Sequence, residues 1–156
     1  LDTITHENIE CCDILFYENN NITLVHVKKG FRNTIRDLAA QISISAKRVR
    51  DALASNDTYF DKVEAMAKKS VKKDDLRKAI AAQTFPVQGL TKLFNQIPRP
   101  SITFCLAFVD TVDKKRSINT QIEEFGSNIA KYSLIELGEE LRKMNYQFKI
   151  VQIQKA

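Results

Sequence analysis

The chain is poor in the residues that interrupt regular structure. Its 156 residues include only 4 Gly and 3 Pro, so we expect long helices and strands within a single domain spanning residues 1–156. Cysteine is also scarce: Cys11, Cys12 and Cys105 are odd in number and irregularly spaced, which favours buried thiols in a reducing, cytoplasmic compartment over a disulfide framework. Adjacent strand residues point to opposite faces, so Cys11 and Cys12 are not expected to bind one zinc ion together.

Several functional signatures are missing as well. No run approaches the ~18 apolar residues of a membrane-spanning helix, and no signal peptide is visible, so we expect no membrane partner. There is no glycine-rich phosphate loop and no nucleophile elbow, which leaves P-loop enzymes and serine hydrolases without support. Because the chain begins at Leu1 and not at Met, we expect it to be the C-terminal part of a longer protein.

The charge balance points to an acidic partner. The net charge is +5 and the isoelectric point is about 9.1, and nucleic acid, either DNA or RNA, is the commonest partner of a basic protein. No exposed aromatic pattern typical of single-strand stacking accompanies the basic residues. The predicted nucleic-acid contacts are Lys29, Arg32, Arg36 and Arg48. A solvated helix face fits the same residues equally well.

Hydrophobic periodicity predicts a hairpin near the start of the chain. Residues 10–17 alternate with apolar side chains on both faces, which is typical of a strand covered on both sides. Residues 18–21 are Asn-rich and suit a turn, because Asn tolerates positive φ. Residues 22–28 form the returning strand, in which His26 and Lys28 share a face because they are two residues apart.

The remaining pattern alternates helices and strands. Residues 102–109 form a continuous apolar run typical of a central buried strand, and 146–154 read as a last strand. Residues 110–119 are polar and are expected to form a mobile loop. The expected helices are 34–54, 59–69, 74–83, a short one at 90–95, and one opened by a capping box at Ser133 and Glu136. This order favours an α/β domain with a mixed central sheet flanked by helices.

One constellation in the hairpin suits metal chemistry. Asp13 in the first strand offers a hard carboxylate oxygen for Mg²⁺, and Lys28 can stabilise negative charge on a phosphate. A neutral imidazole at His26 suits Mn²⁺ better than Mg²⁺. Each residue also has a structural interpretation: a turn residue at 13, a core histidine at 26 and a solvated lysine at 28.

This layout resembles the PD-(D/E)XK metal-dependent nucleases, in which an acid on one strand of a hairpin and an acid-x-Lys on the other converge on a divalent metal. His26 stands where those enzymes carry the second acid. The resemblance implies a restriction-endonuclease-like fold, Mg²⁺ or Mn²⁺ held by Asp13 and His26, and catalytic roles for Asp13, His26 and Lys28. It also implies a supporting role for Gln41, which matches a glutamine of the RecB-like branch.

A more specific resemblance covers about Glu10 to Ile153. The segments IECCDIL, LVHVKKG, LAAQISISAKRV and NIAKYSLIELGEELRKMNYQFKIVQI are similar to the C-terminal half of an uncharacterised bacterial family described as sporadically distributed. In that family the His recurs where a nuclease carries an acid. We therefore predict a metal-dependent nuclease. The alternative is a catalytically degenerate nucleic-acid-binding or assembly domain of a bacterial defence or mobile-element protein. A homo-oligomer is left open.

Overall fold

The computed structural model describes residues 9–55, 57–70, 88–112 and 116–154. The helix expected at 74–83 lies outside these residues. The described elements are, in chain order, β1 (Ile14–Glu18), β2 (Asn21–Lys29), α1 (Thr34–Ser55), α2 (Tyr59–Ser70), α4 (Leu90–Phe94), β3 (Ser101–Asp110), the 3₁₀ turn η1 (Ile122–Glu124), α5 (Asn128–Lys143) and β4 (Gln147–Gln154).

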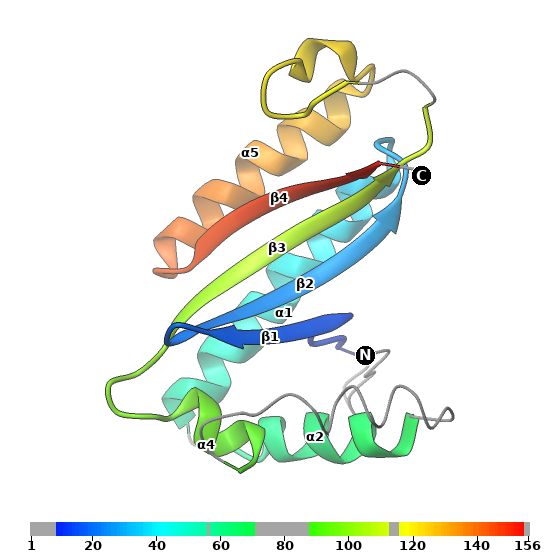
Figure 1. Ribbon diagram of the computed structural model, residues 1–156. Helices are drawn as coiled ribbons and strands as arrows, with labels where there is room; N and C mark the ends of the chain where they lie inside the picture. Colours follow the sequence, from blue (N-terminus) through cyan, green and yellow to red (C-terminus); the bar gives the residue numbers. More distant parts are fainter. Residues whose placement is uncertain (1–8, 56, 71–87, 113–115, 155–156) are drawn as a thin grey trace.

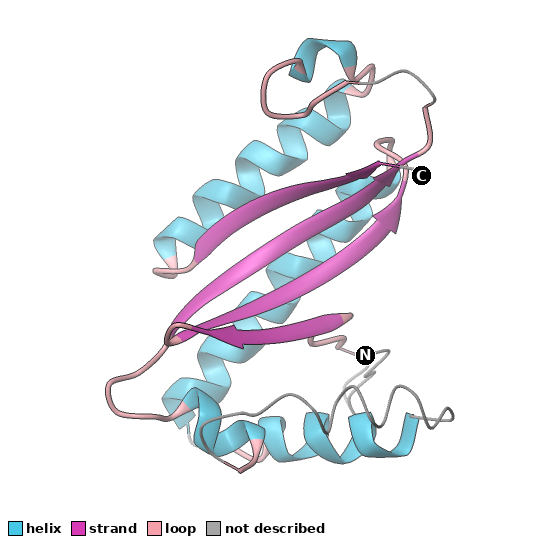
Figure 2. Ribbon diagram, in the orientation of Figure 1, coloured by secondary structure: helices cyan, strands magenta, loops and turns pink. Residues whose placement is uncertain are grey.

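The strands form one four-stranded mixed sheet in the order β1-β2-β3-β4. β1 pairs with β2 in the antiparallel sense, and β2, β3 and β4 are parallel. Because the parallel strands follow one another in chain order, right-handed crossovers place both connecting helices on the same face. Figures 1 and 2 show this arrangement, with α1 and α5 together behind the sheet. The predicted α/β class with a mixed, helix-flanked sheet is confirmed.

The hairpin forms where the sequence predicts it. Asn19 and Asn20 both adopt positive φ, at 51° and 57°, as a tight turn that matches strand twist requires. The turn sets the register, which pairs Ile14 with Val25 and Glu18 with Asn21. Alternate residues therefore face the helices, and Leu24 and His26 of β2 are fully buried on that side.

The core lies between the sheet and the pair α1 and α5. Helix α1 buries one continuous stripe at three- and four-residue spacing, from Ile35 to Ala52, as its sequence pattern predicts. Phe104, Leu106 and Phe108 of β3 fill the centre of this layer. The opposite face of the sheet carries a separate, smaller cluster of Val25, Val27, Cys105 and Ala107.

The start of the hairpin differs from the expectation. β1 begins at Ile14, so Cys11 and Cys12 precede the strand and are not held to its alternation. Both side chains are buried in the same core cluster. A hydrogen bond between the two thiols is the main cause that raises the pKa of Cys12. The prediction that they point to opposite faces is wrong. Ile14 and Phe16 are exposed, so the prediction of a strand covered on both sides is also wrong for β1.

The last helix begins earlier than predicted. α5 starts at Asn128, and its N-cap is Ser127, whose side chain accepts a hydrogen bond from the Ala130 N–H. Ser133 lies inside the helix and donates to the Ile129 carbonyl. The Ser-x-x-Glu pattern at Ser133 therefore lies inside the helix, and the buried face of α5 already begins one turn earlier, at Ala130.

Candidate functional site

Asp13 occupies a bend just before β1 and binds the backbone of β2. Its N–H donates to the Val25 carbonyl at 2.9 Å, and its Oδ2 accepts from the Val27 N–H at 2.6 Å. The carboxylate thus takes the place of a strand carbonyl and extends the pairing of β2 beyond the end of β1. This position makes Asp13 a structural partner of the hairpin.

His26 is fully buried on the helix-facing side of β2. Burial is the main cause that lowers the pKa of its imidazole to about 4, against the opposing effect of the nearby Asp13 charge. Neither ring nitrogen has a hydrogen-bond partner in the described part of the chain. The nearby Cys11 carbonyl accepts instead from Ser45 Oγ at 2.7 Å. His26 is therefore neutral at physiological pH and closed to solvent.

These positions do not fit the predicted metal site. The described residues contain no group of three or more His, Cys, Asp or Glu side chains that could hold a metal ion. Asp13 and His26 lie close together, but the carboxylate is engaged with Val27 and the imidazole is sealed in the core. A hard cation with several water ligands, such as Mg²⁺, needs an open and oxygen-rich site.

The other predicted residues are spread over different surroundings. Lys28 is half-buried on the same strand face as His26. Gln41 is exposed on α1, outside the buried stripe of that helix. Arg48 has a side chain that is only 14% exposed; it pairs with Asp57 at 2.7 Å and stacks over the Tyr59 ring. The structure therefore gives Arg48 a packing role and leaves it out of any accessible basic surface.

A second group of predicted residues does come together, at the carboxyl end of β2. Lys28 and Lys29 end the strand, Gly30 turns with φ of 77°, and Arg32 and Arg36 flank the start of α1. Lys29, Arg32 and Arg36 are exposed. Among the described residues, Lys28, Lys29 and Arg32 make no ion pair, whereas Arg36 contacts its exposed neighbour Asp37. We call Lys28, Lys29, Arg32 and Arg36 the basic edge.

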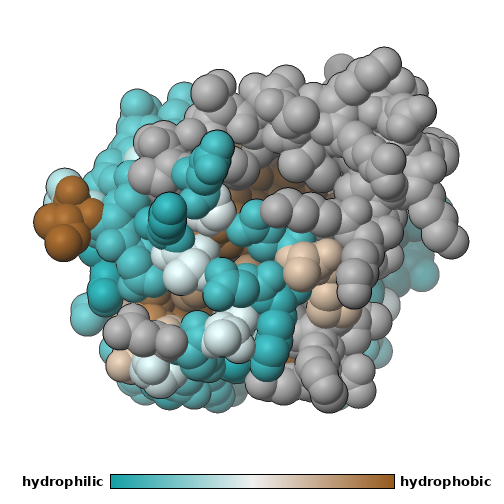
Figure 3. All heavy atoms as spheres, turned by 90° about the horizontal axis from the view of Figure 1, so that it is seen from below, coloured by the Kyte–Doolittle hydropathy of each residue, from teal (hydrophilic) through white to brown (hydrophobic). Residues whose placement is uncertain are grey.

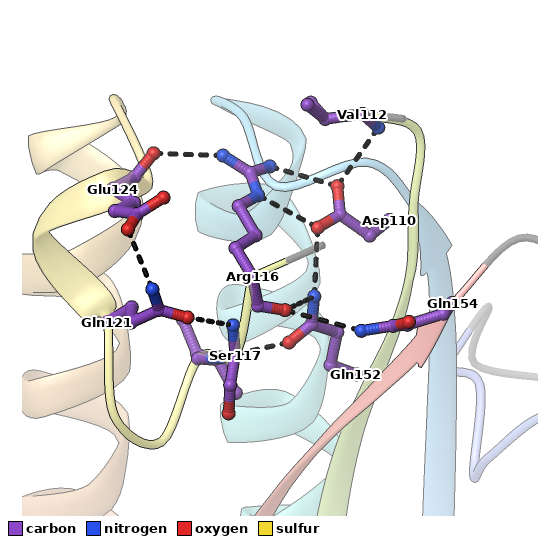
Figure 4. Close-up of polar contacts among 9 residues, drawn as sticks. Asp110, Val112, Arg116, Ser117, Gln121, Glu124, Gln152 and Gln154 are labelled. Carbon is purple, nitrogen blue, oxygen red and sulfur yellow. Dashed lines mark hydrogen bonds and ion pairs between the residues drawn. The ribbon is translucent and has the colours of Figure 1, made fainter. Parts of the chain in front are cut away.

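The carboxyl end of β3 lies beside the basic edge, because the Gly30 N–H donates to the Val109 carbonyl at 2.8 Å. Asp110, which ends β3, is buried and accepts two hydrogen bonds from the Arg116 guanidinium at 2.9 Å each. The Gln152 amide of β4 bridges Asp110 Oδ2 and the Arg116 carbonyl (Figure 4). Arg116 also donates to the Glu124 carbonyl and lies over the Phe125 ring.

This network determines the electrostatics of the edge. The hydrogen bonds from Arg116 are the main cause that lowers the pKa of the Asp110 carboxyl, and the pair cancels its own charge. Asp110 therefore does not offset the cations of the basic edge. The pair also joins the end of β3 to Arg116, so the described residues at the two ends of the predicted 110–119 loop are bonded to each other.

The Asp110–Arg116 pair was missed by sequence reasoning. An acid directly after an apolar strand was visible, but nothing in the intervening sequence singled out Arg116 as its partner. The only usable signal was the position of Asp110 at the carboxyl end of a buried parallel strand, which is where α/β sheets collect polar groups.

One open pocket lies elsewhere, between α1, α2 and α4. It is lined by Ala52, Asp57, Phe60, Thr91, Lys92 and Asn95. Asp57 caps the Tyr59 N–H, Thr91 donates to Asp61, and Asn95 donates to the Thr91 carbonyl, so these lining groups are already engaged. This end of the molecule presents mainly hydrophilic described residues (Figure 3). The pocket is a weaker candidate than the basic edge.

No described helix is both long and apolar enough to cross a membrane. The model of a family of unknown function, DUF6119, matches residues 2–154, so the chain belongs to this family. No curated protein and no solved structure matches the chain.

Proposed function

For this member of a family of unknown function, we propose nucleic-acid binding without catalysis, through the basic edge. The observation that carries the proposal is the set of cations at the carboxyl end of β2, in which Lys28, Lys29 and Arg32 have no ion-pair partner among the described residues. Unpaired cations at a sheet edge are available to phosphate groups, and their neighbour Asp110 is neutralised by Arg116.

The start of α1 adds to the same potential. The first turn of a helix carries a partial positive charge that favours phosphate oxygens. In α1 the Ile35 and Arg36 N–H groups already donate to the Arg32 and Asn33 carbonyls, so the attraction comes from this charge and from the side chains. Arg32 precedes the turn, and Arg36 lies within it beside Asp37. Backbone contacts of this kind are independent of base sequence, so the proposed binding is electrostatic and strongly dependent on salt.

The test is a salt titration of binding to labelled duplex DNA and duplex RNA. Four neutralised phosphates predict a log-log salt slope of about −3.6 on DNA, and the Lys29→Ala/Arg32→Ala double variant should flatten it by about 1.8. The matched control is Lys143→Ala/Arg142→Ala, which removes the same charges from the exposed C-terminal end of α5. That end lies at the amino end of the parallel strands, away from the basic edge (Figure 1).

Two results would count against the proposal. The first is no binding at low salt. The second is an equal loss in the basic-edge and control variants, which would indicate a response to net charge alone.

A metal-dependent nuclease of the PD-(D/E)XK type is the second candidate. It is favoured by the closeness of Asp13 to His26 and by the shared strand face of His26 and Lys28. The burial of His26 and the engagement of the Asp13 carboxylate weigh against it. Incubation with plasmid and single-stranded DNA in Mg²⁺ or Mn²⁺ separates the two functions. Cleavage that disappears in Lys28→Ala would replace the binding proposal with the nuclease.

A further inference from the structure

Two neighbouring thiols lie together in the core just before β1. Cys11 and Cys12 are each 1% exposed and belong to the same cluster between the sheet and the helices. Residues 11–13 belong to no helix or strand, so these two side chains escape the alternation that would separate them in a strand. The thiols form a hydrogen bond with each other, which brings the two sulfur atoms into contact.

Buried polar groups without partners lie next to this pair. The Tyr59 hydroxyl is beside the Cys11 sulfur, and the His26 ring is near the Cys11 carbonyl. Neither the Tyr59 hydroxyl nor either ring nitrogen of His26 has a hydrogen-bond partner among the described residues. Buried polar atoms are normally satisfied, and a redox role is one reason for an exception.

We propose that Cys11 and Cys12 form a site of reversible oxidation, at which a peroxide joins the two sulfur atoms in a disulfide between neighbouring residues. First the Cys11 sulfur attacks one peroxide oxygen: an S–O bond forms, the O–O bond breaks, and the leaving hydroxide takes the Cys11 proton as water. Then the Cys12 sulfur attacks the Cys11 sulfur: the S–S bond forms, and the sulfenic oxygen leaves with the Cys12 proton as a second water. The thiols lose two electrons and two protons, and the peroxide is reduced to water.

The hydrogen bond between the thiols assigns the two steps to different residues. It is the main cause that lowers the pKa of Cys11 and raises the pKa of Cys12. Because the thiolate is the reactive form, Cys11 is the sulfur that attacks the peroxide, and Cys12 is the thiol that resolves the intermediate. The Tyr59 hydroxyl favours the same assignment, since it lies beside Cys11 and can donate to a thiolate there.

A disulfide between neighbouring residues is strained and therefore readily reversed. Adjacent Cα atoms are about 3.8 Å apart across a trans peptide, whereas the Cα atoms of a disulfide usually lie ~4.4–6.8 Å apart. Strained disulfides are the labile ones, which other thiols reduce by exchange. The bond between Cys11 and Cys12 is thus a transient modification and not a structural crosslink.

Closing the bond turns the peptide between the two residues. The Cys11 carbonyl belongs to that peptide and accepts a hydrogen bond from the buried Ser45 hydroxyl of α1 at 2.7 Å. Rotation of the peptide removes this acceptor and leaves the hydroxyl buried without a partner, which is costly. We therefore expect the oxidised chain to be less stable than the reduced chain.

Cys105 provides an internal comparison for the reactivity of the pair. It is also buried, at 4% exposed, but it lies in β3, which is paired with a strand on each side. Peroxide reaches Cys105 only if the centre of the sheet opens, whereas residues 11–13 can open locally beside the edge strand β1. The pair should therefore be oxidised about tenfold faster than Cys105, because local opening needs less free energy.

The first test treats the folded 156-residue chain with hydrogen peroxide and alkylates the remaining thiols after unfolding. We expect the peptide with residues 11 and 12 to lose about 2 Da and escape alkylation, and dithiothreitol to restore it. Cys105→Ser should leave this result unchanged. Cys12→Ser should stop at a sulfenic acid on Cys11 that a cyclic dione captures, whereas Cys11→Ser should react far more slowly. Circular dichroism checks that each variant is folded.

The second test measures urea unfolding of the Cys105→Ser chain in its reduced and oxidised forms. Oxidation should lower the urea midpoint. Ser45→Ala should lower the midpoint of the reduced form only, because oxidation has already removed that hydrogen bond. Ser133→Ala removes a hydroxyl that donates inside α5, so it is the matched control and should affect both forms alike.

Four results would overturn the proposal. Oxidation of the pair that occurs only in urea would mean that the folded chain keeps peroxide out. Equal rates at the pair and at Cys105 would remove the role of local opening. A disulfide that joins two chains would show that Cys11 and Cys12 do not react with each other. An equal effect of Ser45→Ala on both forms would break the link from the thiols to α1.

Discussion

At position 26 the chain holds an imidazole that no solvent reaches, and this makes stability depend on pH. Burial lowers the pKa of His26 to about 4, whereas an unfolded histidine titrates near 6.5. The unfolded chain therefore binds the proton first as the pH falls. The contribution of neutral His26 is complete above about pH 6.5 and is lost progressively down to about pH 4.

We expect His26 alone to lower the free energy of unfolding by about 2 kcal/mol between about pH 7.5 and about pH 5. Urea unfolding at both values measures this loss, and His26→Leu, which removes the titrating group but keeps an apolar side chain, should abolish that part of it. Carboxyl groups with lowered pKa values, such as Asp110, lose their contribution at lower pH and are common to both proteins. Equal pH dependence in both would show that solvent reaches His26.

At the scale of the element, the start of α5 offers a direct comparison of two serines. Ser127 caps the helix by accepting from the Ala130 N–H, so Ser127→Ala should lower the free energy of unfolding by about 1 kcal/mol. Ser133 only donates to the Ile129 carbonyl inside the helix, so Ser133→Ala should change stability by less than about 0.5 kcal/mol. Thermal or urea unfolding measures both. The reverse order would move the start of the helix to Ser133.

The connection between β3 and α5 depends on one buried ion pair. Asp110→Ala leaves the Arg116 guanidinium buried without its acid, so we expect a loss of about 3 kcal/mol in the free energy of unfolding. Asp51→Ala breaks the exposed pair with Arg50 and serves as the control, with an expected loss below about 1 kcal/mol. Similar losses in the two variants would mean that water reaches Asp110.

At the scale of the whole molecule, the two ends of the sheet should differ in their importance for binding. The basic edge lies at the carboxyl end of the parallel strands, and Arg142 and Lys143 lie near their amino end (Figure 1). A polyanion held at the basic edge should therefore lose more affinity in Lys29→Ala/Arg32→Ala than in Arg142→Ala/Lys143→Ala, although both variants remove two charges. The ratio of the two dissociation constants at one fixed salt concentration measures this difference.

Much of the architecture follows from the sequence by itself. Period-two and helical patterns depend only on residues close together in the sequence. Such patterns predict the hairpin at Asn19 and Asn20, the buried stripe of α1 and the buried strand β3. The cations of the basic edge likewise lie close together in the sequence, between positions 28 and 36. The sequence determined that an α/β domain forms and that positive charge follows the second strand.

Only the tertiary structure decided which side chains are accessible. Asp13, His26 and Lys28 are arranged by strand parity, but α1 packs over that face and seals His26 in the core. The sequence shows Arg48 and Arg116 only as two basic residues. In the fold, each forms an ion pair with an aspartate and packs over an aromatic ring. Burial depends on contacts between segments distant in the chain, so local pattern cannot specify it. The same holds for the sheet face opposite α1 and α5, because strand order and crossover hand together place both of these helices on one side of the sheet.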